Sequence, residues 1–394
     1  MAGPTEVVPS ALGYRMPAEW EPHAATWLAW PHYEGDWPAK FEPIPWVYAE
    51  IIRHLAKHER VELIVNNAAS AKKARRILER ADAFSSNIRF HRWPTNRVWL
   101  RDSGCIFLTA GQPGLARPDP FDSLRSLRAG SRGQLSPHDS LESTIALKFR
   151  FNAWAKYSNW RHDERIGSLM ARVALPTVRK SRRVGQPLEI CPHSAGKRIV
   201  LEGGSIDVNG AGTILTTEEC LLSKVQERNP HMSRVHYEKA FADYLGAQHT
   251  IWLGRGILGD DTHGHVDDLT RFVTRDTVIT MVEPNAKDAN HSPLRANLRR
   301  LQSARDQSGK QLTVVELPMP QPVVFEGRRL PASYANFYIA NEIVLAPVFN
   351  RANDRVALNT LAELFPSRQI MPIYSGDFIW GLGAMHCMTQ QQPA

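Results

Sequence analysis

The feature that most constrains the fold is a helix-like stretch followed by an extended apolar run, a pairing that occurs five times along the chain. Apolar residues recur at helical spacing in the first part of each unit, and a short β-type run follows. The helical stretches are residues 46–58, 163–175, 235–245, 294–304 and 354–365, and the runs are residues 61–65, 198–201, 250–253, 312–315 and 370–373. Further strand-like pieces cover residues 212–215, 271–282 and 337–348. This alternation predicts an α/β fold with internal pseudo-symmetry rather than separate domains.

Residues 1–394 are therefore expected to form a single domain with a large core. One segment, residues 110–144, stands apart because it is rich in Gly, Pro, Ser, Asp and Arg and has little periodicity. Such composition predicts a loop insertion, either a lid over a site or a passive surface loop.

Composition and charge exclude several classes of protein. Residues 1–15 lack a basic stretch followed by an apolar run, and no apolar run reaches the ~18 residues of a membrane span. The four cysteines have no CxxC spacing, which is typical of free thiols in a reducing compartment. The net charge of +8 comes with basic clusters at residues 72–80, 125–132 and 179–183, but with no nucleic-acid-binding motif, so these clusters are expected on a solvated surface. We expect a cytoplasmic protein with no membrane or nucleic-acid partner.

The C-terminal tail is unusual because it carries a lone thiol. Terminal segments are usually polar and disposable. Here Cys387 follows Gly381 and Gly383 and precedes a run of hydroxyl and amide side chains. A cysteine at a position where a chain normally frays requires an explanation, and three upstream segments supply one.

The first of these segments is Gly-Asp-Asp-Thr-His-Gly-His-Val-Asp-Asp, residues 259–268. If it forms one strand, His263, His265 and Asp267 share a face. Imidazole and carboxylate groups together suit zinc or manganese, which would make this half of a metal site. Alternatively, His265 is a metal-free general acid and base and Asp267 binds substrate, or the segment is a polar turn before a strand at 269–273. The residues alone leave these three interpretations open.

The other two segments each place a carboxylate beside small residues. Asp102 lies in Trp-Leu-Arg-Asp-Ser-Gly, residues 99–104, where an Arg-Asp pair can also be a local salt bridge. Glu202 ends an apolar run and precedes Gly203 and Gly204, where backbone can approach a ligand closely, although a hairpin or bulge is equally compatible. Neither segment is decisive by itself.

Together, these residues fit one chemistry. Carboxylates accept paired N–H bonds from a planar guanidinium, so Asp102 and Asp267 can hold one with its central carbon facing Cys387. Glu202 can orient His265 and support its charged form. The guanidinium carbon is a poor electrophile, so a thiolate is needed to attack it, and a nearby imidazolium or cationic substrate lowers the pKa of the thiol. The predicted reaction is hydrolysis of a C–N bond with loss of ammonia.

The chain resembles the agmatine deiminase and bacterial-type peptidylarginine deiminase family of the guanidino-group modifying superfamily. The resemblance rests on seven motifs in order: MPAEWEPH at 16–23 with TW at 26–27 and WP at 30–31, WLRDSG at 99–104, LEGGS at 201–205, TTEECLL at 216–222 with NP at 229–230, DTHGHVD at 261–267, SYANFY at 333–338 and HCMTQQ at 386–391.

This resemblance implies a five-bladed α/β propeller of the pentein type and a set of roles. Cys387 is implied as the nucleophile, His265 as the acid and base, and Glu202 as the support of the histidine. Substrate contacts are implied for Asp102, Asp267, Asn336, Trp99 and Gly383. No metal or other cofactor is implied, which makes His263 a neighbour that shapes the loop.

The expected function is agmatine deimination to N-carbamoylputrescine and ammonia, a step of polyamine biosynthesis. Some positions depart from the family pattern: Cys105 stands where Pro is common, Asn96-Arg97 where an acid is common, and residues 30–37 lack a typical Arg. The sequence therefore determines the reaction, deimination, better than it determines the chemical group at the far end of the substrate. The alternatives are a peptidyl-arginine deiminase, a deiminase of another small guanidino compound, a metal-dependent ureohydrolase and a catalytically silent binding protein. A homo-oligomer is compatible with each.

Overall fold

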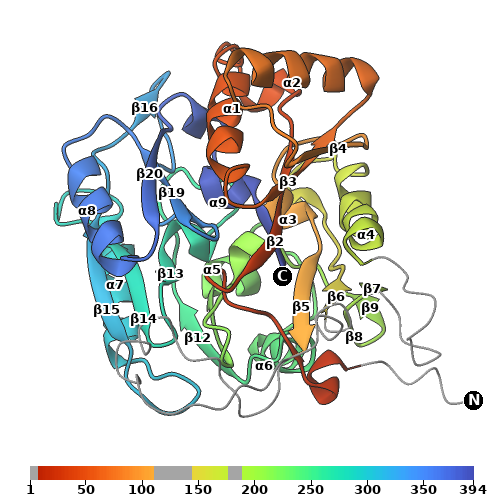
Figure 1. Ribbon diagram of the computed structural model, residues 1–394. Coiled ribbons are helices and arrows are strands. Elements are labelled where there is room, and N and C mark those ends of the chain that lie inside the picture. The colour runs from red at the N-terminus through yellow and green to blue at the C-terminus, as the bar shows by residue number, and fades with distance from the viewer. Residues whose placement is uncertain (1–7, 111–143, 176–188) are drawn as a thin grey trace, which may run out of the picture.

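The computed structural model describes residues 8–110, 144–175 and 189–394 (Figure 1). Within these residues the strands form five sheets of three or four strands and two two-stranded hairpins. The predicted insertion at 110–144, apart from its two end residues, lies outside the described residues, as do the basic clusters at 125–132 and 179–183. The α/β class predicted from the sequence is confirmed.

Each of the five larger sheets contains two parallel strands joined by a helix. The units are β2 (His23–Ala29), α1 (Ile44–Leu55) and β3 (Arg60–Val65); β6 (Thr144–Leu147), α4 (Asp163–Ala174) and β7 (Glu189–Ile190); β11 (Thr213–Thr217), α6 (Arg234–Ala240) and β12 (His249–Leu253); β14 (Thr277–Val282), α7 (His291–Ser303) and β15 (Thr313–Pro318); and β19 (Ile343–Val348), α8 (Asp354–Leu364) and β20 (Gln369–Tyr374). Parallel neighbours need a crossover connection, which explains why each predicted helix precedes a strand.

The prediction of a strand at residues 198–201 was wrong. Residues 198–201 do not supply the parallel partner of β6, because β7 does so and β9 (Lys197–Arg198) pairs instead with β8 (His193–Ser194) in a hairpin. Beyond that hairpin, Val200 forms only an isolated parallel bridge to Arg150. The hairpin turns through Ala195 and Gly196, both with positive φ, and the apolar run after it then bends at Gly203 into a short helix. The run is therefore too short to build a strand.

Two other predicted pieces are hairpins rather than single strands. Residues 271–282 divide into β13 (Thr270–Phe272) and β14, and residues 337–348 divide into β18 (Tyr338–Ile339) and β19, each pair antiparallel. β10 (Asp207–Val208) pairs with β11 in the same way. The sheet of β6 is extended by β5 (Ile106–Ala110) and β1 (Tyr14–Arg15), and that of β3 by β4 (Ile88–Arg92).

The C-terminal tail is a buried strand. β21 (Gln390–Pro393) pairs antiparallel with β2, and the amide nitrogen of Ala394 donates to the carbonyl of Pro22 at 2.9 Å. The indole of Trp27 donates to Gln392 at 3.1 Å. In Figure 1 the C-terminus accordingly lies in the middle of the view. This pairing fixes the segment that carries Cys387.

The helices are amphipathic and pack on several apolar cores, the largest of which includes residues of α1 and α2. Helix α1 buries Tyr48, Ile51, Ile52 and Leu55, and α2 (Ala68–Arg80) packs against it. On α2 only Ala74 and Leu78 are buried, so most of its basic side chains face solvent, as predicted for the cluster at 72–80. Over the three described stretches of the chain, no helix has the length and apolarity to span a bilayer.

Four short helices meet at the centre of the fold. They are α3 (Leu100–Ser103), η5 (Gly203–Ser205), η7 (Val266–Asp268) and α9 (Met385–Met388). Helix α3 contacts both α9 and η5, and η5 contacts η7. Each of the four carries or adjoins a candidate site residue.

Candidate active site

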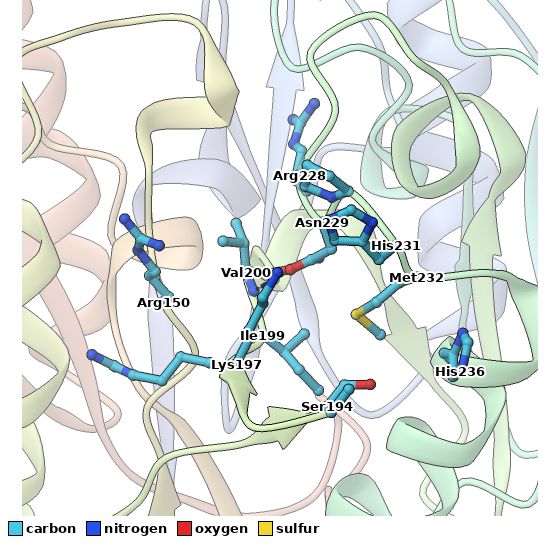
Figure 2. Close-up of a pocket in the computed structure, with 13 residues that line it drawn as sticks. Arg150, Ser194, Lys197, Ile199, Val200, Arg228, Asn229, His231, Met232 and His236 are labelled. Carbon is cyan, nitrogen blue, oxygen red and sulfur yellow. Dashed lines mark hydrogen bonds between the residues drawn. The ribbon is translucent and has the colours of Figure 1, made fainter.

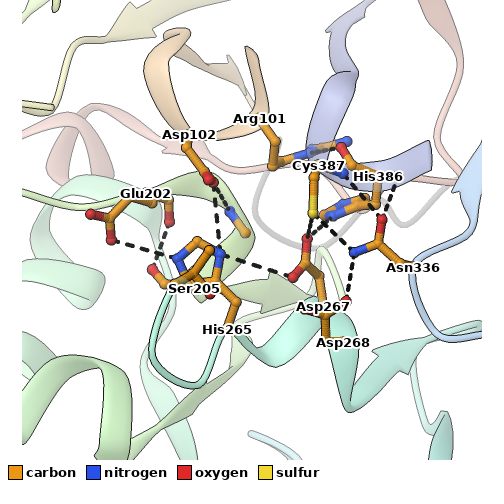
Figure 3. Close-up of polar contacts among 12 residues, drawn as sticks. Arg101, Asp102, Glu202, Ser205, His265, Asp267, Asp268, Asn336, His386 and Cys387 are labelled. Carbon is orange, nitrogen blue, oxygen red and sulfur yellow. Dashed lines mark hydrogen bonds and ion pairs between the residues drawn. The ribbon is translucent and has the colours of Figure 1, made fainter. Parts of the chain in front are cut away.

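The structure brings the five predicted catalytic residues together (Figure 3). Asp102 lies on α3, Asp267 on η7 and Cys387 on α9, while Glu202 and His265 directly precede η5 and η7. All five are buried. Segments almost three hundred residues apart thus contribute to one cluster.

Asn336 holds the segment that carries the thiol. Its Oδ1 accepts hydrogen bonds from the backbone nitrogens of His386 at 3.0 Å and Cys387 at 3.3 Å. Its Nδ2 donates to the Cys387 Sγ at 3.0 Å and to Asp268 at 3.0 Å. The amide therefore fixes both the backbone and the sulfur of Cys387, whereas the role of Asn336 as a substrate contact stays a prediction.

The Cys387 thiol lies in a negatively charged environment. It donates to the Asp267 Oδ2 at a distance of 3.6 Å. Burial, together with the charges of Asp267, Asp268 and Asp102, raises the pKa of Cys387 well above its ordinary value. The thiol is thus protonated near neutral pH, and a cation bound among these carboxylates would favour its ionisation.

Asp102 and Asp267 each have hydrogen-bonding neighbours within the site. Asp102 accepts from the Trp154 indole at 2.8 Å and from the Gly204 amide at 3.0 Å. The Asp267 Oδ2 lies 2.7 Å from the His386 Nδ1, whereas no described residue donates to its Oδ1. Burial raises the pKa of Asp102 to about 6, with the charge of Asp267 adding to the effect. Burial also opposes ionisation of Asp267, but its contact with His386 outweighs this and lowers its pKa.

The His265 imidazole lies between three carboxylates. Its Nδ1 is 3.9 Å from Asp102 and 4.0 Å from Asp267, and its Nε2 is 3.7 Å from the Glu202 Oε2. Neither ring nitrogen has a hydrogen-bond partner among the described residues. Burial alone would lower the pKa of His265, but the charge of Asp102 and contacts with Cys220 and Glu202 raise it well above its ordinary value. The ring therefore carries a proton that it can give to a neighbouring group.

Glu202 is ionised because of a residue that the sequence reasoning did not single out. The Arg228 Nε lies 3.1 Å from the Glu202 Oε1, and both side chains are fully buried. Burial opposes ionisation of Glu202, yet Arg228 and His265 lower its pKa to about 2. Arg228 directly precedes the Asn-Pro motif at 229–230, and that adjacency was the one available signal.

Three other neighbours of the site were missed. Trp154 contacts Asp102, Asp268 contacts Asn336, and His386 bridges Asp267 and Glu19, its Nε2 lying 2.9 Å from the Glu19 Oε2. Asp268 follows the predicted Asp267, and His386 precedes the predicted Cys387. This adjacency in the sequence was the signal that could have found them. Trp154 has no motif around it, and only the fold places it here.

Residues 263–267 do not lie in one strand, which was the condition for His263, His265 and Asp267 to share a face. His263 has a φ of +67° and Gly264 one of +92°, so the backbone turns before η7 begins. The His263 ring consequently points elsewhere and lies 3.0 Å from the Ser223 hydroxyl. The groups that come close enough together for a metal ion are instead Glu202, Cys220 and His265, with ligand atoms within 4.8 Å of one another. This set differs from the His263–His265–Asp267 set considered from the sequence.

Cys387 and Asp102 line a cavity of about 610 Å³. Trp99 and Gly383, both predicted substrate contacts, line it as well. A Cβ on Gly383 would lie 2.7 Å from the Trp99 ring and 3.1 Å from the Cys387 Cβ, so only glycine fits beside the nucleophile. The cavity is therefore the place where a substrate could reach the thiol.

A second cavity, of about 700 Å³, lies elsewhere (Figure 2). Its lining includes Arg150, Lys197, Arg198 and His236, but none of the predicted site residues. Arg228 also lines it, although the Arg228 guanidinium is buried against Glu202. Size alone would favour this cavity, whereas the chemistry of the lining favours the one with Cys387.

Comparison with known proteins agrees with this geometry. An α/β fold with a buried cluster of a thiol, an imidazole and several carboxylates, next to a cavity that the thiol lines, fits the class of enzymes with a cysteine nucleophile. The model of the Porphyromonas-type peptidyl-arginine deiminase family matches residues 15–393, and the chain belongs to this family. The resemblance read from the sequence motifs is thereby confirmed.

Relatives and solved structures match over nearly their full lengths. The agmatine deiminase of Pseudomonas aeruginosa strain UCBPP-PA14 is 32% identical over 417 residues, covering 100% of this chain and 99% of the relative. The agmatine deiminase of Enterococcus faecalis superposes with a TM-score of 0.81 at 26% identity, covering 100% of this chain and 99% of that one. A C. jejuni agmatine deiminase with substrate bound superposes with a TM-score of 0.75 at 26% identity, covering 97% of this chain and 96% of that one.

Proposed function

We propose that this protein is an agmatine deiminase, a hydrolase that converts agmatine and water to N-carbamoylputrescine and ammonia. The observation that carries the proposal is the clustering of Cys387, Asp102, Asp267, His265 and Glu202, of which Cys387 and Asp102 line one cavity. A full-length relationship to the agmatine deiminases of Pseudomonas aeruginosa and Enterococcus faecalis supports the choice of substrate. The product suits a role in polyamine biosynthesis.

In the proposed reaction, Asp102 and Asp267 bind the guanidinium, and the bound cation favours loss of the Cys387 thiol proton to solvent. The sulfur then attacks the guanidinium carbon. Protonated His265 gives its proton to the departing nitrogen, so the C–N bond breaks and ammonia leaves. The carbon remains bound to sulfur as an amidino-thioether.

The second half of the reaction releases the product. Neutral His265 takes a proton from a water molecule, which attacks the same carbon. The C–S bond breaks, the thiol is restored and the ureido product leaves. Glu202, kept ionised by Arg228, supports the positive charge of His265 through both halves.

We also propose a five-bladed arrangement of the five helix-linked sheets, forming a single domain over residues 1–394. The common strand–helix–strand unit of the five sheets supports this arrangement. The meeting of the short helices α3, η5, η7 and α9 supports a central site. A cytoplasmic location, Trp99 and Gly383 as substrate contacts, and independence from metal belong to the same proposal.

Product analysis tests the function. The wild-type protein is incubated with agmatine, with or without a chelator and with or without prior thiol alkylation. We expect ammonia and N-carbamoylputrescine, no effect of the chelator, and loss of turnover after alkylation. Urea release, or sensitivity to the chelator alone, would contradict the thiol mechanism.

Peptidyl-arginine is the second candidate substrate, because the description of the matching family model names that activity. An arginyl peptide in the same assay separates the two. Turnover of the peptide without turnover of agmatine would replace the leading proposal while keeping the chemistry.

A further inference from the structure

The cavity that contains Cys387 extends from a buried end to a solvent-exposed end. Cys387 and Asp102 line its buried end, with 6% and 4% of their surfaces exposed. The side chains of Lys156 and Arg328, which also line it, are 39% and 51% exposed. A substrate held by its guanidinium at the buried end would place its other end among the outer residues.

Two further carboxylates line this cavity, Asp36 and Asp261. Both oxygens of Asp261 are engaged: Oδ1 binds the Lys156 ammonium, and Oδ2 accepts from the Tyr157 hydroxyl at 2.5 Å. Arg328 lies 3.8 Å from the same Oδ1. Each oxygen of Asp261 therefore already has a donor.

Asp36 differs, because only one of its oxygens is used. Its Oδ1 accepts from the Arg97 guanidinium, whereas no described residue donates to its Oδ2. The side chain is 3% exposed, so bulk water does not replace the missing donor. Burial raises the pKa of Asp36 to about 7 in spite of Arg97, which shows that one cation does not fully compensate this carboxylate.

The Arg97 guanidinium does not donate to the second oxygen, although its Nε also has no hydrogen-bond partner among the described residues. Its guanidinium lies 4.2 Å from the Tyr157 ring centroid and 5.4 Å from that of Tyr33. Its NH2 also donates to Asn159 at 3.3 Å. The free oxygen of Asp36 is thus left for a donor that enters the cavity.

We propose that the Asp36 Oδ2 binds the distal ammonium of agmatine, which makes Asp36 the residue that selects guanidino substrates with a terminal amine. This inference rests on the proposed function, since it requires the guanidinium at Asp102 and Asp267. An ammonium donates hydrogen bonds and has no acceptor, as the free oxygen requires.

The surrounding cations do not favour a substrate carboxylate instead. Arg97 is paired with Asp36, and Lys156 and Arg328 are paired with Asp261. A carboxylate would have to displace one of these pairs, whereas an ammonium needs to displace nothing at Oδ2. The free oxygen of Asp36 therefore suits the terminal ammonium of agmatine better than a carboxylate.

The test compares agmatine with butylguanidine, which has the same carbon chain but no amine, and with 4-guanidinobutyrate, which ends in a carboxylate. We expect wild-type kcat/KM to favour agmatine over butylguanidine by roughly 10- to 100-fold, the range of a charge-assisted hydrogen bond. In D36N this preference should fall to within about three-fold, mainly through KM. Equal wild-type values for agmatine and butylguanidine, a preference retained in D36N, or a preference for 4-guanidinobutyrate would overturn the inference.

A matched control is E34Q, which removes an exposed carboxylate of the same segment that does not line the cavity. Its preference should equal that of the wild type. D36N leaves Arg97 beside a neutral amide, so folding is checked by thermal melting and by turnover of butylguanidine. If D36N does not fold, D36E keeps the charge and shifts the carboxylate by one methylene; it should still reduce the preference for agmatine.

Binding without turnover gives an independent readout. In the C387S background, calorimetry should show agmatine binding more tightly than butylguanidine, and C387S/D36N should remove the difference. Failure of the proposed function looks different, because the wild-type protein would then turn over none of the three guanidines. Turnover of all three guanidines with a preference for agmatine that does not depend on Asp36 would overturn only this inference.

Discussion

Cys387 lies in an environment that opposes the thiolate its proposed role requires. Burial and three aspartates raise its pKa, and no described cation contacts its sulfur. The same aspartates form a site for a cation. The nucleophile is therefore expected to become reactive only when a guanidinium occupies the cavity, which protects the thiol from unselective reactions.

The first prediction concerns this thiol. C387S should reduce kcat with agmatine by at least three orders of magnitude, because a hydroxyl lacks the nucleophilicity of a thiolate. Steady-state kinetics and a thermal melt measure activity and folding together. C191S is the matched control, since Cys191 is only half-buried, lies outside the site, and should remain fully active. Comparable activity in C387S would remove the covalent mechanism.

The second prediction follows from the raised pKa of Asp102, about 6. Asp102 is partly protonated near pH 6 in the free protein, and a bound guanidinium favours its ionised form. Agmatine binding should therefore release a proton near pH 6, and affinity should weaken as the pH falls below that value. Calorimetry of C387S in buffers of different ionisation enthalpy measures the release.

Two comparisons make that measurement specific. At pH 8 the release assigned to Asp102 should vanish, because the carboxyl is already ionised. In C387S/D102N it should be absent at pH 6, and the affinity should fall by roughly 10- to 100-fold as a charged acceptor becomes neutral. Proton release that persists in the double variant would assign the titration to another group, such as His265.

At the scale of elements, the site depends on four helices of three or four residues each. These elements are too short to be stable alone and are held by tertiary contacts. Helix α9, which carries Cys387, is followed closely by β21. The pairing of β21 with β2 fixes the position of this segment. Gln391 of β21 also accepts from Arg101, the neighbour of Asp102, at 2.6 Å.

The third prediction tests this strand. Deleting residues 390–394 removes β21 and should lower activity by at least 100-fold, together with the melting temperature, because α9 loses its anchor. Deleting Ala394 alone removes one backbone hydrogen bond and an exposed residue, and should leave most of the activity. Full activity in the longer deletion would show that α9 is positioned without the strand.

At the scale of the whole molecule, a net charge of +8 opposes the approach of a dicationic substrate. The site compensates with a local group of carboxylates that includes Asp102, Asp267 and Glu202. Selectivity for the cation is thus a short-range property, while the long-range field acts against it.

The fourth prediction concerns salt. Raising ionic strength from about 10 mM to 150 mM shortens the screening length from roughly 30 Å to 8 Å, so kcat/KM for agmatine should stay level or rise up to a few-fold. Butylguanidine, with a single charge, should respond less. A marked fall in kcat/KM with agmatine would indicate that the overall field attracts the substrate and would contradict this account.

Much of this protein was determined by the sequence alone. Helical periodicity identified the helices that link the parallel strands. Apolar residues spaced by about 3.6 positions lie on one face of a helix, and this spacing is visible in the sequence alone. The chemistry of guanidinium recognition selected Cys387, His265, Asp102, Asp267 and Glu202 from four distant segments, and the structure places all five together.

Only the tertiary structure decided the rest. Nothing local in the sequence places Trp154 on Asp102, Arg228 on Glu202 or a free oxygen of Asp36 beside the catalytic cavity. The positive φ at His263 and Gly264 bends the backbone, so His263 and His265 do not share a strand face and His263 contacts Ser223 instead. These features arise from contacts between segments far apart in the chain, which periodicity and motif spacing do not encode, and they set the pKa values and the substrate preference proposed for the site.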